Sequence, residues 1–197
     1  FRYRDLPKAD SIVPDHEVQG PFDAVVVIDG DRHRLTPPIA ELFKHSPRRF
    51  IIDHHATTEP DGYDFAWISP EETSTCTMLQ KALARWREPL DATLAALLYA
   101  GTVYDTGGFR YQNTTAETHR LAADLLACEF DHVRIAAQTL VERRLGGLRL
   151  LADTLSSSQP LVNNALMMSK LSICCTSCGD RPWRTLVCLR PPVSRKM

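Results

Sequence analysis

The sequence has no excess of charge of either sign and no long hydrophobic run. Its 197 residues carry 23 Lys and Arg against 24 Asp and Glu, a formal net charge of -1. This balance excludes a global positive field that would attract nucleic acid, so an anionic ligand has to be held by a local site. The longest apolar runs, such as LAALLYA, are far too short to cross a membrane, and the first residues lack the apolar core of a signal peptide. We therefore expect a cytoplasmic protein without a membrane partner.

Cysteine is scarce in most of the chain. Cys76 and Cys128 fall in helix-like segments, where we expect them to pack as small apolar side chains. The other four crowd into the tail: Cys174, Cys175, Cys178 and Cys188. The spacing of CCTSC suits half of a zinc site, but a matching second pair is missing and no histidine follows residue 132. A zinc module therefore ranks last among the functions considered, and a disulfide framework does not suit a cytosolic chain.

The first half of the chain reads as strand, short helix, strand. Residues 25–28 form a β-branched run typical of a strand that is buried on both faces, and residues 50–53 form a second apolar run. Two adjacent prolines suit the start of a short helix between these two strands, and Pro47 ends the helix. This order predicts parallel neighbouring strands joined by a right-handed crossover, and hence an α/β fold. We expect residues 56–72 to be a loop.

The second half reads as helical. Residues 74–88 predict a helix that Thr73, Ser74 or Thr75 caps and that Pro89 terminates, followed by an apolar helix that breaks at Gly101. Thr114 or Thr115 is expected to cap the next amphipathic helix, and residues 132–158 continue as a helix interrupted at Gly146 and Gly147. Beyond Ser156 no sustained period of either kind is found.

Acidic and imidazole groups follow the predicted strands. Asp29 ends the first strand, Asp53 ends the second and is followed by His54 and His55, and Asp105 precedes a pair of glycines. The carboxyl ends of parallel strands meet at one edge, so these groups are expected to converge there. Mixed carboxylates and imidazoles suit divalent manganese, iron or zinc, and close carboxylates ionise together only when a cation neutralises them. The alternative is an incidental polar turn after a strand.

The remaining histidines are expected to be surface groups. His33 is close enough to the predicted site to stay a candidate. The others are His16, His45, His119 and His132.

Four segments, in order and spacing, resemble the DHH phosphoesterases: VVVIDGD, FIIDHH, SPEETSTC and YAGTVYDTGGFRYQNTTAETHRLAADLL. The resemblance is closest to the bacterial bifunctional oligoribonuclease and pAp phosphatase type, related to the exonuclease RecJ, and covers roughly residues 20–155. It implies a parallel β-sheet flanked by helices. It also implies a DHH catalytic domain over residues 1–155, without its first strand and motif, followed by a linker and the truncated remnant of a second domain over residues 156–197.

The resemblance further implies the roles of the site residues. Asp29 is similar to the carboxylate that bridges two metal ions, and His54 and Asp105 are similar to further ligands of one of them. The expected ions are two Mn²⁺, with Mg²⁺ or Co²⁺ as alternatives. His55 resembles the histidine that faces the scissile phosphate, and Asp53 resembles a group that orients a histidine.

Residues around these ligands have supporting roles by the same resemblance. Arg110 is expected either to hold a phosphate or to be a solvated surface residue. Thr106 and Gly107 are similar to positions where the backbone passes close to the site. Ser74 and Thr75 match the polar helix start below it.

The implied activity is metal-dependent hydrolysis of phosphate esters in short single-stranded RNA, in 3'-phosphoadenosine 5'-phosphate (pAp), or in both. Two departures matter: only 28 residues precede Asp29, too few for the family's first motif of a histidine and two aspartates, and the substrate-binding domain is not recognisable. We therefore expect a fragment of a longer enzyme, with its own activity and a homodimer left open. The alternatives are a non-catalytic module that binds a nucleotide or a protein partner, and an inorganic pyrophosphatase.

Overall fold

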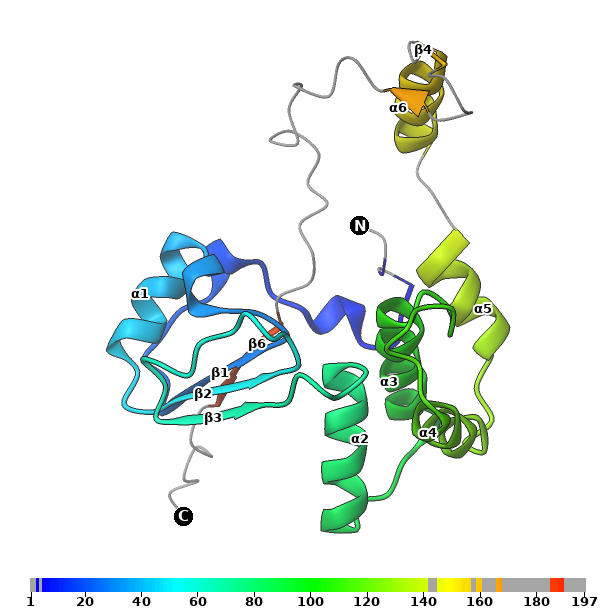
Figure 1. Cartoon of the computed structure of the whole chain (residues 1–197). Helices are drawn as coiled ribbons and strands as arrows, with labels where there is room; N and C mark the ends of the chain where they lie inside the picture. The colour runs from blue at the N-terminus through cyan, green and yellow to red at the C-terminus, as the bar shows by residue number, and fades with distance from the viewer. Residues whose placement is uncertain are drawn as a thin grey trace.

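The computed structural model describes residues 3, 5–141, 145–156, 159–160, 166–167 and 185–189. Two parts lie side by side: a sheet with helix α1 (Pro37–His45) on it, and a group of helices centred on α3 (Ala92–Asp105) (Figure 1). Two short 3-10 turns, Ala9–Ser11 and Asp15–Glu17, precede the first strand.

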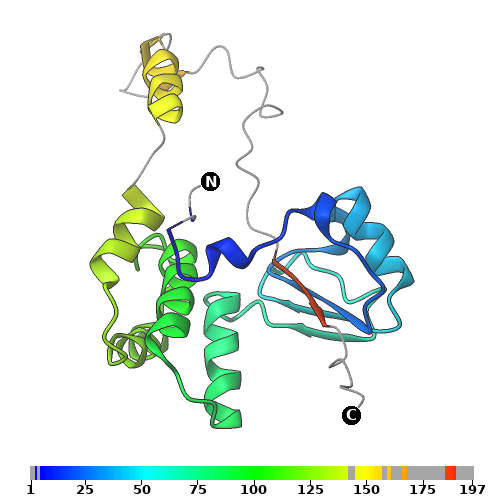
Figure 2. The same cartoon turned by 180° about the vertical axis from the view of Figure 1, so that it is seen from behind.

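The sheet has three parallel strands and one antiparallel edge strand. Its order is β3 (Phe65–Ile68), β2 (Arg49–Asp53), β1 (Ala24–Ile28) and β6 (Thr185–Leu189). β1 pairs in parallel with β2, β2 pairs in parallel with β3, and β6 runs antiparallel to β1 (Figure 2). The predicted parallel sheet flanked by helices is therefore confirmed, and the carboxyl ends of β1 and β2 lie next to each other.

One hydrophobic cluster joins the sheet to α1. Val25 and Ile51 are fully buried in neighbouring strands, and Phe43 of α1 packs with them. Pro37 and Pro38 occupy the first turn of α1, where a missing N–H costs nothing, and the helix ends before Pro47 as expected. The crossover from β1 to β2 through α1 thus buries one face of the sheet.

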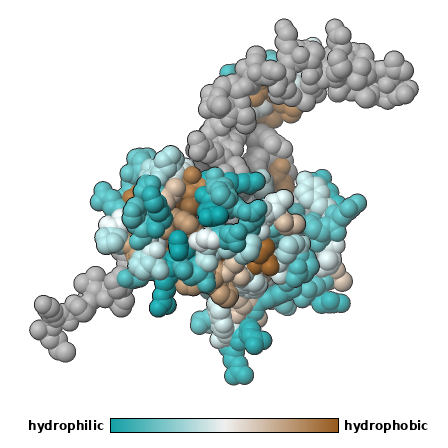
Figure 3. Space-filling view, turned by 60° about the vertical axis from the view of Figure 1, so that its left-hand side comes forward, coloured by the Kyte–Doolittle hydropathy of each residue, from teal (hydrophilic) through white to brown (hydrophobic). Residues whose placement is uncertain are grey.

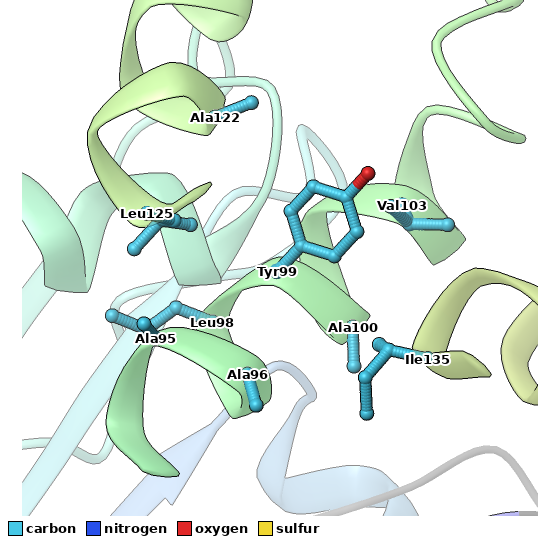
Figure 4. Close-up of a cluster of buried hydrophobic side chains, with 9 residues drawn as sticks. All are labelled: Ala95, Ala96, Leu98, Tyr99, Ala100, Val103, Ala122, Leu125 and Ile135. Carbon is cyan, nitrogen blue, oxygen red and sulfur yellow. The ribbon is translucent and has the colours of Figure 1, made fainter. Parts of the chain in front are cut away.

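The second cluster surrounds α3. Helices α2 (Thr75–Trp86), α4 (Ala116–Leu126) and α5 (His132–Ala136) pack against it, and α5 continues as a single π-type turn, Ala137–Val141. Most faces of α3 are apolar, which suits a helix covered on several sides. Figure 4 shows the buried members: Ala95, Ala96, Leu98, Tyr99, Ala100, Val103, Ala122, Leu125 and Ile135.

Three expectations for the elements are wrong. Residues 65–68, expected within a loop, form β3, a four-residue edge strand flanked by turn residues whose first side chain is exposed. α3 runs through Gly101, and Cys76 of α2 fills the space beside that glycine, which leaves no room for a side chain. α6 (Leu145–Ser156) includes Gly146 and Gly147.

The predicted packing of the two early cysteines is confirmed. Cys76 and Cys128 are partly buried against the cluster around α3. Cys174, Cys175 and Cys178 lie outside the described residues, and Cys188 is described only as part of the backbone of β6. The zinc hypothesis therefore stays a prediction.

The chain beyond residue 156 contributes three described strands. β4 (Gln159–Pro160) pairs with β5 (Leu166–Met167), and β6 pairs with β1. The division into a domain of residues 1–155 and a remnant of residues 156–197 stays a prediction. Among the described residues, no helix is long and apolar enough to span a membrane. The face shown in Figure 3 is mainly hydrophilic, with hydrophobic side chains in small separate patches.

Candidate metal centre

The candidate centre lies where the sheet meets the helices around α3. Asp29 directly follows β1, His54 and His55 directly follow β2, and Asp105 is the last residue of α3. Asp29 has a φ of 59°, a left-handed conformation that is unfavourable for a residue other than glycine. Such strain is typical of functional positions. Its N–H donates to the carbonyl of Ile52 at 3.0 Å, which fixes this turn on the neighbouring strand.

His54 points its ring nitrogen Nε2 at two carboxylates. Nε2 lies 3.6 Å from Oδ1 of Asp29 and 3.7 Å from Oδ2 of Asp105. This nitrogen is buried and has no hydrogen-bond partner among the described residues. Two atoms that bind one ion at about 2.0–2.2 Å lie roughly 3–3.5 Å apart, close to these separations. A buried imidazole nitrogen between two carboxylates, too distant for hydrogen bonds, fits a divalent cation.

His55 completes the same cluster. Ligand atoms of Asp29, His54 and His55 all lie within 4.8 Å of one another. The His55 ring packs against that of His54, with the ring centroids 4.5 Å apart. His55 therefore borders the ion site, either as a further ligand or as a group that faces a substrate bound there.

Asp53 fixes the orientation of His55. Its carboxylate is fully buried, and Oδ1 lies 2.7 Å from Nδ1 of His55. The same oxygen accepts hydrogen bonds from the backbone N–H groups of His54 and His55, and the Thr58 hydroxyl donates to the other oxygen. With Nδ1–H directed at Asp53, the other ring nitrogen of His55 is left for a ligand.

Two pKa values are perturbed at the centre. Burial raises the pKa of Asp105 to about 7, and the nearby charge of Asp29 adds to this effect. Burial lowers the pKa of His55, but the hydrogen bond to Asp53 and the surrounding carboxylates outweigh burial, so that its net pKa is raised. An excess of carboxylates thus makes the site attractive to a cation.

Polar groups on α2 and the segment before it support the ligands. The Thr75 hydroxyl donates to Oδ1 of Asp29 at 3.0 Å. The carbonyl of Glu72 lies 3.4 Å from Nδ1 of His54, opposite the nitrogen that faces the carboxylates. Lys81 holds the Glu72 carboxylate at 2.7 Å and 3.0 Å. Ser74 forms the capping box of α2 and is fully buried.

Three groups that support the site were not predicted from the sequence. Asn113 donates to the carbonyls of Thr73 and Asp105 at 3.0 Å and 3.1 Å, and so ties the loop after α3 to the start of α2. Thr58 and the Glu72 carbonyl were missed as well. A threonine in a loop and a backbone carbonyl have no distinguishing pattern, and only the fold brings them to the site.

The residues after Asp105 form a tight loop. Thr106 is buried and bonds to the carbonyl of Thr102, and Gly107 and Gly108 have positive φ. A Cβ on Gly107 would lie 2.4 Å from the ring of Tyr111, so glycine is required there. Nε of Arg110 donates to the carbonyl of Gly107 at 2.6 Å. Among the described residues this is the one hydrogen bond of its side chain, which is not brought into the metal cluster.

The structure thus brings together five of the six predicted site residues and places Arg110 on the adjacent loop. The predicted ligands converge from three separate elements on one small volume, as the topology requires. Their donor set of carboxylates and imidazoles suits Mn²⁺, Fe²⁺ or Zn²⁺.

Two relatives of known type share this part of the sequence, although no protein-family model matches the chain. The chain is 33% identical over 126 residues to the bifunctional oligoribonuclease and PAP phosphatase NrnA of Bacillus subtilis, which covers 62% of this chain and 36% of that protein. It is 35% identical over 75 residues to the NrnA of Thermus thermophilus, covering 38% of this chain and 23% of that protein. The chain therefore spans about a third or less of the length of these relatives.

A solved structure shares the fold. It is an exopolyphosphatase-related protein from Bacteroides fragilis, with a TM-score of 0.69 at 23% sequence identity, over 80% of this chain and 49% of that one. The resemblance drawn from the motifs is confirmed by the relatives, and the fold by this neighbour.

Proposed function

We propose that this chain is the metal-binding part of a DHH phosphoesterase that hydrolyses phosphate esters of short oligoribonucleotides, of pAp, or of both. The observation that carries the proposal is the buried Nε2 of His54, which lies between the carboxylates of Asp29 and Asp105 without a hydrogen-bond partner in the described part of the chain. The similarity to NrnA proteins supports this class of substrate. Mn²⁺ as the metal, a homodimer and a cytoplasmic location stay predictions.

Asp29, His54 and Asp105 would hold the metal, with Thr75 orienting the Asp29 carboxylate. A divalent metal at this position supplies a Lewis acid for phosphate oxygens and lowers the pKa of bound water. The backbone supports this arrangement, since the strained turn at Asp29 is tied to β2 and the end of α3 is tied to Asn113. The ligands are thus positioned before any substrate arrives, which favours catalysis by orientation.

His55 acts on the phosphate in this proposal. Its side chain is 47% exposed, whereas that of Asp53 is fully buried, so the ring has one protected nitrogen and one accessible nitrogen. With Nδ1 held by Asp53, the accessible nitrogen can, when protonated, donate a hydrogen bond to a phosphate oxygen or a proton to a leaving oxygen. Asp53 positions this ring and stabilises its positive charge.

The direct test is hydrolysis by the chain itself in the presence of Mn²⁺. The substrates are a 5'-labelled oligoribonucleotide of three nucleotides and pAp, and the variants are Asp29→Asn, His55→Ala and the control Asp124→Asn, which changes an exposed carboxylate on α4. We expect hydrolysis by the wild type and by the control. We expect losses of at least roughly a hundredfold for the two site variants.

Two outcomes would overturn the proposal. If the wild type binds Mn²⁺ but cleaves neither substrate, and a form extended upstream to restore the first motif is also inactive, the non-catalytic module becomes the better interpretation. If it cleaves pyrophosphate instead, the centre is retained and the substrate class is wrong. A calorimetric Mn²⁺ titration of His54→Ala checks the metal independently of turnover, and unchanged affinity would remove this ligand from the proposed set.

A further inference from the structure

A small cavity is lined in part by His55. It has a volume of about 200 Å³ and is formed by the segment after β1 and the segment after β2. Ligand pockets for drug-sized molecules measure roughly 300–1,000 Å³, so this cavity suits a small group and is too small for a whole nucleotide. His55 and Asp53 belong both to the cavity and to the candidate centre.

Two cationic or ionisable side chains line this cavity and have no partner among the described residues. His33 and Arg34 are exposed, and within the described part of the chain neither side chain makes a hydrogen bond or an ion pair. By contrast, Arg49 pairs with Asp64 and Lys81 pairs with Glu72. An unpaired guanidinium that borders a small cavity is available for an anion.

The backbone that carries these side chains is held in place. They belong to a 3-10 turn, Arg32–Arg34, whose first N–H donates to the hydroxyl of Tyr63 at 2.8 Å. The Asp31 carboxylate caps the turn by accepting from the N–H of His33 at 2.9 Å. The position of the turn beside the centre is therefore fixed before a ligand binds.

The charges of the cavity are mixed, and the acidic ones are largely engaged. Asp53 already accepts hydrogen bonds from His55 and Thr58 and from two backbone N–H groups. Asp31 is engaged as the cap of its turn. The Thr57 hydroxyl, Arg34, His33 and the accessible edge of His55 remain as groups that can donate to an anion.

We propose that this cavity binds a second phosphate of the substrate, next to the one at the metal centre. The inference rests on the proposed function and adds to it the site that holds the second phosphate of pAp or of an oligoribonucleotide. Arg34 is the main recognising group, and His33 assists it.

The test compares the binding of adenosine 5'-phosphate and of pAp to the chain with Mn²⁺, measured by calorimetry. The wild type is expected to prefer pAp by roughly tenfold or more, the size of an added charged hydrogen bond. Arg34→Ala should remove most of this preference. The control Arg85→Ala removes an exposed arginine near the far end of α2 and should keep the preference.

A variant that removes a negative charge from the cavity, instead of a positive one, provides a second test. Asp31→Asn removes a negative charge from the cavity but keeps a residue that caps the turn well, so it should bind pAp at least as tightly as the wild type. Weaker binding of pAp by this variant would show that the cavity recognises something other than an anion. Equal behaviour of Arg34→Ala and Arg85→Ala, or no binding of pAp by the wild type, would also overturn the inference.

Failure of the proposed function and failure of the phosphate cavity would give different results. If the chain shows the Arg34-dependent preference but hydrolyses neither compound, the phosphate cavity stands and the catalytic proposal is wrong. If it hydrolyses pAp and the preference does not depend on Arg34, the catalytic proposal stands and the phosphate cavity is wrong.

Discussion

Replacing Asp105 by asparagine should move folding stability and metal affinity in opposite directions. The side chain of Asp105 is 21% exposed, and burial followed by the charge of Asp29 raises its pKa from 3.8 to about 7. The folded, metal-free chain therefore binds this proton more tightly than the unfolded chain does. Its stabilising contribution is complete below a pH of about 4, the ordinary pKa of the group, and is lost as the pH rises through 7.

The size of the effect on stability follows from the difference between the pKa of Asp105 in the folded chain and in the unfolded chain. At pH 8 the ionised carboxylate costs the metal-free chain roughly 4 kcal/mol of unfolding free energy, as an upper value. Asp105→Asn removes this cost, so the variant should be more stable than the wild type at pH 8 in the presence of a chelator. At pH 5 the carboxyl is protonated in the folded wild type but largely ionised in the unfolded chain, so the advantage of the variant should shrink to roughly 1.5–2 kcal/mol.

The affinity for Mn²⁺ should change in the opposite direction to the unfolding free energy. A proton has to leave Asp105 when a cation binds, so the affinity of the wild type for Mn²⁺ should fall by about tenfold for each pH unit below 7 and level off above it. Asp105→Asn should bind Mn²⁺ at least roughly tenfold more weakly at pH 8. Loss of a residue that only supports a metal ligand already costs about tenfold or more in metal affinity, and loss of the ligand itself should cost no less. The first assay is urea unfolding at both pH values, and the second is calorimetric titration.

Two results would refute this reasoning. If Asp105→Asn is less stable than the wild type at pH 8 without metal, the carboxylate is not a desolvated charge. If the variant binds Mn²⁺ as tightly as the wild type, Asp105 is not a ligand.

Two further predictions concern positioning and packing. Asp53→Asn should lower the pKa of His55, followed by NMR of the ring, because burial is then no longer opposed by the Asp53 charge; an unchanged titration would separate the two residues. Gly101→Ala should cost about 1–3 kcal/mol of unfolding free energy, since its Cβ would lie 2.2 Å from Sγ of Cys76. The control Gly147→Ala meets no atom within 4 Å and should gain about 0.5–1 kcal/mol. Equal unfolding midpoints for the two alanine variants would contradict the packing of α3 on α2.

The elements with a strong local signal could be predicted from the sequence. The β-branched run before Asp29 and the apolar run before His54 form strands because each is buried, and the helix after Ser74 begins at its cap as expected. β3 could not be predicted, because its four residues are all apolar and bordered by turn residues, so that no polar and apolar alternation marks a strand. The use of glycine at position 101 reflects a close contact with Cys76, which lies on another helix.

The candidate site also has residues that could be predicted from the sequence and residues that could not. The ligands could be predicted because they follow apolar strands and carry unusual residue types, and parallel topology then brings them to one edge. Their supports are set by tertiary contacts: the hydroxyl of Thr58 reaches Asp53, and Asn113 joins two loops through backbone carbonyls. No spacing in the sequence distinguishes such residues from ordinary surface residues. The cavity beside Arg34 likewise depends on the position of its turn relative to β2.

The central claim is that Asp29, His54 and Asp105 hold a divalent cation between them. Crystals of the chain soaked in Mn²⁺ test it most directly, by anomalous scattering recorded near the manganese absorption edge. We expect an anomalous peak within bonding distance of Nε2 of His54 and of the two carboxylates, and no such peak in crystals of His54→Ala. A peak bound by other residues, or its persistence in the variant, would contradict it.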